Sequence, residues 1–185
     1  MERYYSVKAS VDDIGEAEGR LFDLTESLGT EFEQVDIYFR SNSGTLKMRN
    51  MPPSPEGQLI STQLIECHDN KRLIENTTTV IDNVDSLRET LCASLGIVDT
   101  VVKSRRVFLL PDARIYLDDV KRVGKYLEIL VAVVPASPGA KETGEERACR
   151  RANEIAEALN IGKSESIPLS YIELMCPNDR LPQRS

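Results

Sequence analysis

Basic side chains recur at alternate positions in two β-rich segments. Lys47 and Arg49 flank the apolar Met48, so they are two positions apart. Lys103 and Arg105 form a second basic pair with the same spacing. Because successive side chains of a strand point to opposite faces of a sheet, the two members of each pair share a face.

Three further segments place polar side chains on one face in the same way. Arg114, Tyr116 and Asp118 alternate with apolar residues. Glu128 stands on the polar face of the next β-like segment, and Lys8 on the polar face of the first one. Five segments therefore combine one apolar face with one face that carries charge.

Each set taken alone is most simply explained as the solvated face of an open sheet. Five segments with the same pattern are harder to explain in that way. If helices cover the apolar faces, closing the sheet into a barrel gathers the charges in its interior. Burying several like charges is costly unless an anion or carboxylates compensate them. We therefore expect a polyanionic ligand inside such a barrel.

Short β-like segments joined in hairpins must position these residues. The residue pattern predicts strands over 3–9, 35–40, 45–49, 58–67, 75–81, 100–110, 113–119 and 125–134. It predicts helices over 12–28, 85–95 and 143–160, and a short final element over 167–175. The expected fold class is α+β, a closed antiparallel β-barrel (tunnel) of about eight strands with helices packed outside.

The order of the motifs resembles that of the CYTH superfamily, the triphosphate tunnel metalloenzymes. This family includes class IV adenylyl cyclases, thiamine triphosphatases and inorganic triphosphatases. The matching stretches are residues 36–39, 44–49, 64–65, 95–97, 102–106, 114–118, 123–128 and 170–174. They span nearly the whole chain in the order typical of the family. Length and ending look most similar to the class IV adenylyl cyclase branch.

The resemblance also implies roles for individual residues. In the family, basic residues of the tunnel hold a triphosphate, and acidic residues hold Mg²⁺ or Mn²⁺. Carried over by position, it implies anion-binding roles for Lys8, Lys47, Arg49, Lys103, Arg105 and Arg114. It implies metal-related roles for Asp118 and Glu128.

The chain departs from the family pattern at the expected metal ligands. The first strand of the family reads Glu-x-Glu-x-Lys, whereas residues 4–8 read Tyr-Tyr-Ser-Val-Lys. In the late Glu-x-Glu strand Glu128 is kept, but Leu130 stands at the second position. Asp118 and Glu128 can supply the minimum for one weakly bound Mg²⁺ or Mn²⁺, since Mg²⁺ is often held by one or two carboxylates together with phosphates and water. Tyr4 and Leu130 make the tunnel less polar, as a partly organic ligand would require.

The sequence thus predicts a tunnel protein that binds a phosphorylated or otherwise anionic small molecule. One hypothesis is a divergent CYTH-family lyase, cyclase or phosphohydrolase whose chemistry depends weakly on metal or not at all. In it Asp118, Glu128 or Tyr116 moves protons, and Tyr4 contacts the ligand. A rival hypothesis is a catalytically silent protein that binds a polyphosphate or a nucleotide. A third is an ordinary class IV adenylyl cyclase or triphosphatase with a reduced metal site.

Composition narrows the class of protein. A net charge of −7 argues against a broad nucleic-acid-binding surface. No apolar run approaches the ~18 residues that span a bilayer, and the N-terminus has no apolar signal core, so we expect a cytoplasmic protein without a membrane partner. The single histidine excludes a His-rich metal site. We expect one domain over 1–176 and a flexible tail over 177–185, and the question of a homodimer stays open.

Overall fold

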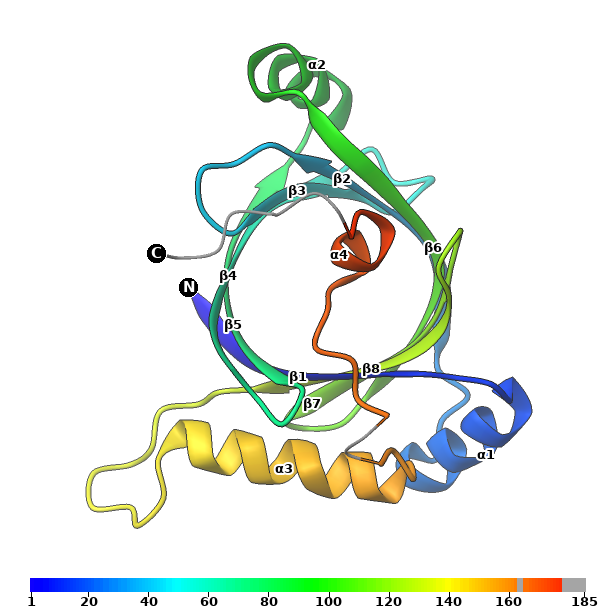
Figure 1. Ribbon diagram of the computed structural model, residues 1–185, viewed down its shortest axis with the longest axis vertical. Helices are drawn as coiled ribbons and strands as arrows, with labels where there is room; N and C mark the ends of the chain where they lie inside the picture. Colours follow the sequence, from blue (N-terminus) through cyan, green and yellow to red (C-terminus); the bar gives the residue numbers. More distant parts are fainter. Residues whose placement is uncertain (163–164, 178–185) are drawn as a thin grey trace.

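The computed structural model describes residues 1–162 and 165–177, and eight antiparallel strands close into a barrel (Figure 1). The strands are β1 (Glu2–Ser10), β2 (Thr30–Phe39), β3 (Thr45–Asn50), β4 (Gly57–His68), β5 (Lys71–Ile81), β6 (Ile97–Leu109), β7 (Ala113–Val120) and β8 (Gly124–Ala132). Their order around the barrel is β1-β5-β4-β3-β2-β6-β7-β8, and β1 pairs with β8 to close it. The predicted α+β barrel is confirmed.

Alternation along each strand separates an apolar outer face from a polar inner one. In β7, Ile115 and Leu117 are buried on the outside, while Tyr116 lines the interior between them. A slip of one residue in register would exchange these faces. The turn from β4 to β5 helps to fix the register, because Asp69 and Asn70 both adopt positive φ angles, as a two-residue hairpin turn requires.

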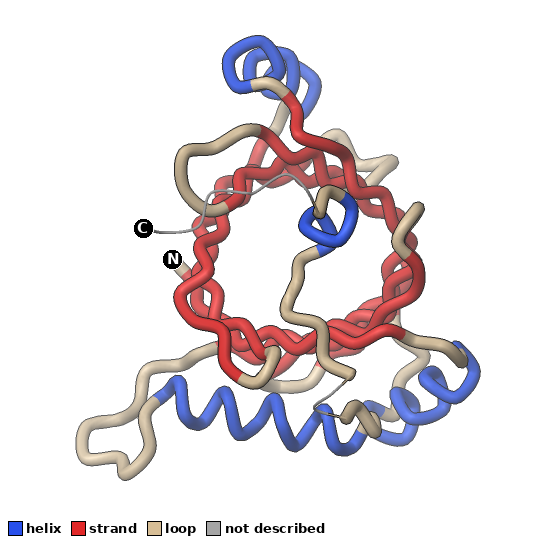
Figure 2. Tube along the Cα trace, viewed as in Figure 1, coloured by secondary structure: helices blue, strands red, loops and turns tan. Residues whose placement is uncertain are grey.

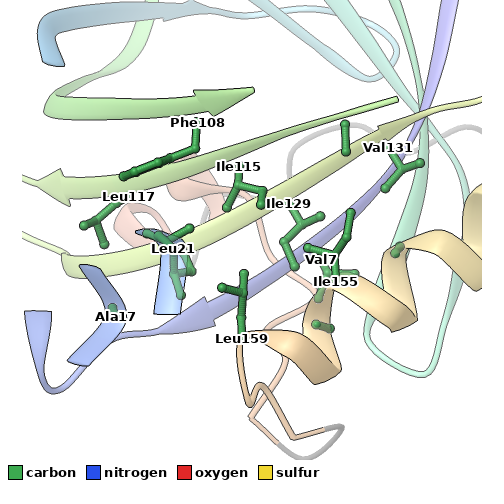
Figure 3. Packing of buried hydrophobic residues seen from close by; sticks show 14 of the residues in the cluster. Val7, Ala17, Leu21, Phe108, Ile115, Leu117, Ile129, Val131, Ile155 and Leu159 are labelled. Atoms are coloured by element: carbon green, nitrogen blue, oxygen red, sulfur yellow. The ribbon is translucent and has the colours of Figure 1, made fainter. Parts of the chain in front are cut away.

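Two helices cover the outer face of β1, β6, β7 and β8. They are α1 (Ile14–Thr25) and α3 (Gly144–Ala158). Leu21 of α1 and Ile155 of α3 are fully buried in one cluster with Val7, Ile115 and Ile129 of the strands (Figure 3). Each such aliphatic side chain contributes about 1.5–3 kcal/mol on burial. This cluster forms the main core, outside the ring of strands, and the charged residues of the barrel interior lie on the opposite face of the same strands.

A third helix packs on the opposite side of the barrel. This helix, α2 (Val84–Leu95), begins with Asn83 as N-cap and buries Val84 against Phe39, Met48 and Ile81. Among the described residues, no helix has the length and apolar character that crossing a bilayer requires.

The last helix lies inside the ring of strands rather than outside it (Figures 1 and 2). The chain reaches α4 (Tyr171–Met175) through Ile167, whose backbone N–H donates to the carbonyl of Lys8 at 2.7 Å. Tyr171 and Ile172 are buried in a cluster with Val101 and Tyr126 of the strands. The sequence predicted a short element here but not its place in the barrel. Apart from Pro177, the tail expected at 177–185 lies outside the described residues.

Candidate functional site

The barrel encloses a cavity of about 140 Å³ that both charged and apolar side chains line. Strands β1, β3, β5, β6 and β8 and helix α4 contribute its charged lining residues, which are Lys8, Lys47, Arg49, Arg72, Lys103, Arg105, Glu128 and Glu173. Five of the six basic residues that the sequence assigned to anion binding therefore face one cavity. Tyr116 and Glu128, proposed from the sequence to move protons, line it too.

A buried carboxylate, Asp36 of β2, holds the two basic residues of β3. Its Oδ1 accepts from Arg49 Nε at 2.9 Å, and its Oδ2 accepts from Lys47 Nζ at 3.2 Å. Gln34 Nε2 donates to it as well. Burial alone would raise the pKa of Asp36, but Arg49, Lys47 and Lys103 hold it well below its usual range. Asp36 is therefore ionised and fixes Lys47 and Arg49 in the cavity wall.

A second buried carboxylate, Asp118 of β7, holds Arg105 of β6. Arg105 donates from Nε to Oδ1 at 2.7 Å and from Nη2 to Oδ2 at 2.6 Å, and the Tyr171 hydroxyl donates to Oδ2 at 2.7 Å. Arg105 Nη2 also donates to Glu128 Oε2 at 2.9 Å, while Lys8 Nζ lies 3.3 Å from Glu128 Oε1. Burial would raise the pKa of Glu128, but Lys8 and Arg105 lower it, so this carboxylate is ionised as well.

The guanidinium of Arg105 stacks on an aromatic ring. Its Cζ lies 3.8 Å from the centre of the Tyr116 ring, a cation–π contact across the strand pair β6–β7. Tyr116 thus packs against the cation that bridges the two carboxylates, Asp118 and Glu128. This contact restricts the orientation of the Arg105 guanidinium, and the predicted role of Tyr116 in moving protons stays a prediction.

Lys103 of β6 lies between these two groups and differs from the other cations. Its Nζ is 3.8 Å from Asp118 Oδ2 and 4.0 Å from Asp36 Oδ2, too far for a hydrogen bond. Among the described residues it has no hydrogen-bond acceptor, although the residue is only 2% exposed. Burial, followed by repulsion from Arg105, lowers the pKa of Lys103 to about 7. Its ammonium group therefore lines the cavity with donors to spare.

The C-terminal helix adds an ion pair that the sequence did not suggest. Arg72 Nη1 of β5 donates to Glu173 Oε2 of α4 at 2.7 Å. Glu173 also accepts from the backbone N–H of Ser170 at the start of the helix. Arg72 Nε is buried without a partner among the described residues. Arg72 is thus a second cation in the cavity wall with an unused donor.

Two predicted ligand-binding residues do not reach the cavity. Arg114 is exposed, and Tyr4 is half-buried with its hydroxyl donating to Glu2 Oε2 at 2.7 Å. Within the described part of the chain neither belongs to the cavity lining. Arg114 pairs with Leu130 and is the second residue of β7, and Tyr4 pairs with Ala132 and is the third residue of β1, so both lie near the ends of their strands. The alternation of residues predicted on which face of the strand Arg114 and Tyr4 lie. It did not predict how far along the barrel axis each side chain lies.

Several cavity residues were missed in the sequence. Gln34, Asp36 and Tyr38 alternate with apolar residues in β2, so the pattern that identified the basic pairs could have found Asp36. Arg72 follows the same pattern, two positions before Ile74 of the cavity wall. Tyr171 and Glu173 lie in the stretch 170–174 that matched the family, but the alternation of strand residues does not apply to a five-residue helix and gave them no role.

The carboxylates do not fit the Mg²⁺ or Mn²⁺ site that the resemblance implies. Both oxygens of Asp118 accept hydrogen bonds from Arg105, and both oxygens of Glu128 face a cation. Within residues 1–162 and 165–177, no three His, Cys, Asp or Glu side chains group so as to hold a metal ion. Mg²⁺ demands near-octahedral oxygen coordination, which would require Arg105 to leave its partners.

No protein-family model and no curated protein sequence matches the chain. Solved structures do match its fold. The PH1012 protein of Pyrococcus horikoshii OT3 superimposes with a TM-score of 0.77 at 20% identity, over 94% of this chain and 99% of that one. A protein of Vibrio parahaemolyticus named as a candidate adenylate cyclase gives 0.71 at 16% identity, over 93% and 97%. HpAC1 of Hippeastrum, a candidate adenylyl cyclase described as having a dominant triphosphatase activity, gives 0.64 at 13% identity, over 98% of each chain. This chain therefore shares the closed-barrel fold of these proteins, two of which are named as candidate adenylate cyclases, and this agrees with the fold that the resemblance to the CYTH superfamily predicted.

Proposed function

We propose that the barrel interior binds a phosphorylated or otherwise anionic small molecule. Lys103 carries this proposal, because the residue is 2% exposed, its side chain lines the cavity, and its ammonium group has no hydrogen-bond acceptor among the described residues, so that a ligand could supply one. Both nearby carboxylates are closer to other cations than to Lys103. An anion in the cavity would accept from the ammonium group of Lys103 and lie beside Arg72, which also lines the cavity.

The ligand should contain phosphate rather than a single carboxylate. Arg49, Arg72 and Arg105 come from three different strands and face one space, together with Lys8 and Lys47. Arginine forks match the oxygens of phosphate, and a tetrahedral group can accept from several walls at once. The names of the structurally similar proteins, which refer to adenylate cyclase and triphosphatase, agree with this class of ligand.

Binding is supported better than the turnover of an ordinary cyclase or triphosphatase. Asp118 and Glu128 are each held ionised by at least two cations, which makes both weak bases. One observation favours a divergent enzyme as the second candidate. The pKa of Lys103 is lowered to about 7, which suits a general acid or base at neutral pH.

Calorimetry on the full chain tests the binding proposal. Inorganic phosphate, pyrophosphate, tripolyphosphate and ATP would be titrated in EDTA and again with Mg²⁺ or Mn²⁺. The proposal expects binding of at least one of them that Lys103→Met weakens. Lys121→Met removes an exposed lysine of the turn after β7 and should leave the affinity unchanged. Absence of binding to every phosphate would overturn the proposal.

The same samples separate the candidate enzymes. Robust metal-dependent turnover of ATP or tripolyphosphate would identify an ordinary cyclase or triphosphatase. Turnover in EDTA with a pH profile that loses its inflection near 7 in Lys103→Met would support the divergent enzyme. Binding without turnover would support the silent binding protein.

A further inference from the structure

The charged groups of the cavity leave a small positive excess. Six cations line it, namely Lys8, Lys47, Arg49, Arg72, Lys103 and Arg105. Four carboxylates pair with them, namely Asp36, Asp118, Glu128 and Glu173. When Lys103 is protonated, as a bound anion favours, the described residues leave two positive charges uncompensated. A phosphomonoester carries about −1.5 to −2 charges at pH 7, which matches this excess.

A triphosphate matches the positive excess of the cavity wall less well than a phosphomonoester does. Its larger negative charge exceeds the excess of the wall and would call for a divalent cation. The carboxylates that could hold such an ion instead accept hydrogen bonds from Arg105 or pair with Lys8.

One part of the cavity wall is apolar. Leu64 and Ile74 are direct partners across β4 and β5, and Leu130 of β8 lines the same space. Ile74 is two residues from Arg72, and Leu130 is two residues from Glu128, so the apolar wall begins about 7 Å from the charged groups along each strand. Inorganic phosphate would leave these side chains facing water, whereas an organic group would cover them.

We infer that the tunnel takes an organic phosphomonoester. Its dianionic phosphate binds between Lys103, Arg105 and Arg72 without a divalent cation, and its apolar body covers Leu64, Ile74 and Leu130. This inference rests on the proposed anion binding and adds to it the charge and the shape of the ligand.

Two probes that share the phosphate group test the inference. Phenyl phosphate and inorganic phosphate are titrated into the full chain in EDTA by calorimetry. Phenyl phosphate should bind at least tenfold more tightly, and addition of Mg²⁺ should not strengthen its binding. Leu130→Ser should reduce the preference for phenyl phosphate and leave the affinity for inorganic phosphate unchanged. The matched control is Leu109→Ser, because Leu109 is 67% exposed at the end of β6.

The outcomes separate this inference from the proposed function. Equal affinity for the two probes would show that the ligand needs no apolar group, and the proposed anion binding would still stand. If tripolyphosphate with Mg²⁺ binds more tightly than phenyl phosphate, the inference that the ligand is a dianion bound without a metal ion is wrong. If no phosphate compound binds, both proposals fail. The comparison of the two probes needs only the natural protein, so it decides the question even if Leu130→Ser does not fold.

Discussion

Replacing Lys103 with methionine should weaken phosphate binding strongly at acidic and neutral pH. Methionine keeps most of the side-chain volume and removes the ammonium group. A hydrogen bond to a charged group contributes about 1.5–3 kcal/mol, so its loss corresponds to a decrease in affinity of about 10- to 150-fold. The variant should stay folded, because Asp36 keeps Arg49 and Lys47, and Asp118 keeps Arg105.

The effect should depend on pH in a defined direction. Burial lowers the pKa of Lys103 to about 7 in the empty protein, so its charge is fully present only below that pH. A bound anion favours the charged form and raises this pKa in the complex. The affinity ratio of the natural protein to Lys103→Met should therefore be largest below pH 7 and fall toward one as pH rises further. Ionisation of the phosphate affects both proteins alike and cancels from the ratio.

Calorimetric titration of inorganic phosphate from pH 5.5 to pH 9 measures this ratio, with Lys121→Met as the exposed control. The number of protons taken up on binding near pH 7, measured from the dependence of the heat on the buffer, should be smaller in Lys103→Met, because the protons released by phosphate are the same for both proteins. A ratio near one at pH 6 would refute the contact between Lys103 and the anion. A large ratio that stays constant up to pH 9 would refute the titration of Lys103.

Three further predictions follow from the same network. Arg105→Met should lower the free energy of unfolding by about 3–5 kcal/mol in urea denaturation, because Asp118 and Glu128 lose a buried partner, and an unchanged midpoint would contradict this. Glu173→Gln should strengthen phosphate binding about tenfold in calorimetry by releasing Arg72 from its ion pair, and weaker binding would show that Glu173 helps to hold the ligand. Mg²⁺ and Mn²⁺ should bind only weakly to the empty protein, and turnover of ATP and tripolyphosphate should be absent or very low. Micromolar metal affinity in a calorimetric titration would contradict the view that the cavity carboxylates are already neutralised by lysine and arginine.

The polar side of each strand could be read from the sequence because alternation is a local property. Lys47 and Arg49 flank a buried methionine, and Lys103 and Arg105 repeat this spacing. Backbone geometry alone places each pair on one face. The closure of eight strands followed from the number of such segments and from the ordered motifs.

How deep each side chain lies in the barrel was decided only by the tertiary structure. Arg114 has the right parity but lies near the end of its strand, where the side chain reaches solvent. Depth depends on the register of both neighbouring strands, which the pattern of a single segment does not contain.

The pairing of charges could not be read from the sequence either. Asp118 was expected to hold a metal ion, yet its oxygens accept from Arg105 and Tyr171, residues that are 13 and 53 positions away. Such contacts between distant positions form only when the barrel closes and α4 enters it. The sequence alone thus determined which side of a strand carries the charged residues. The tertiary structure decided which of them satisfy one another and which, like Lys103, keep donors for a ligand.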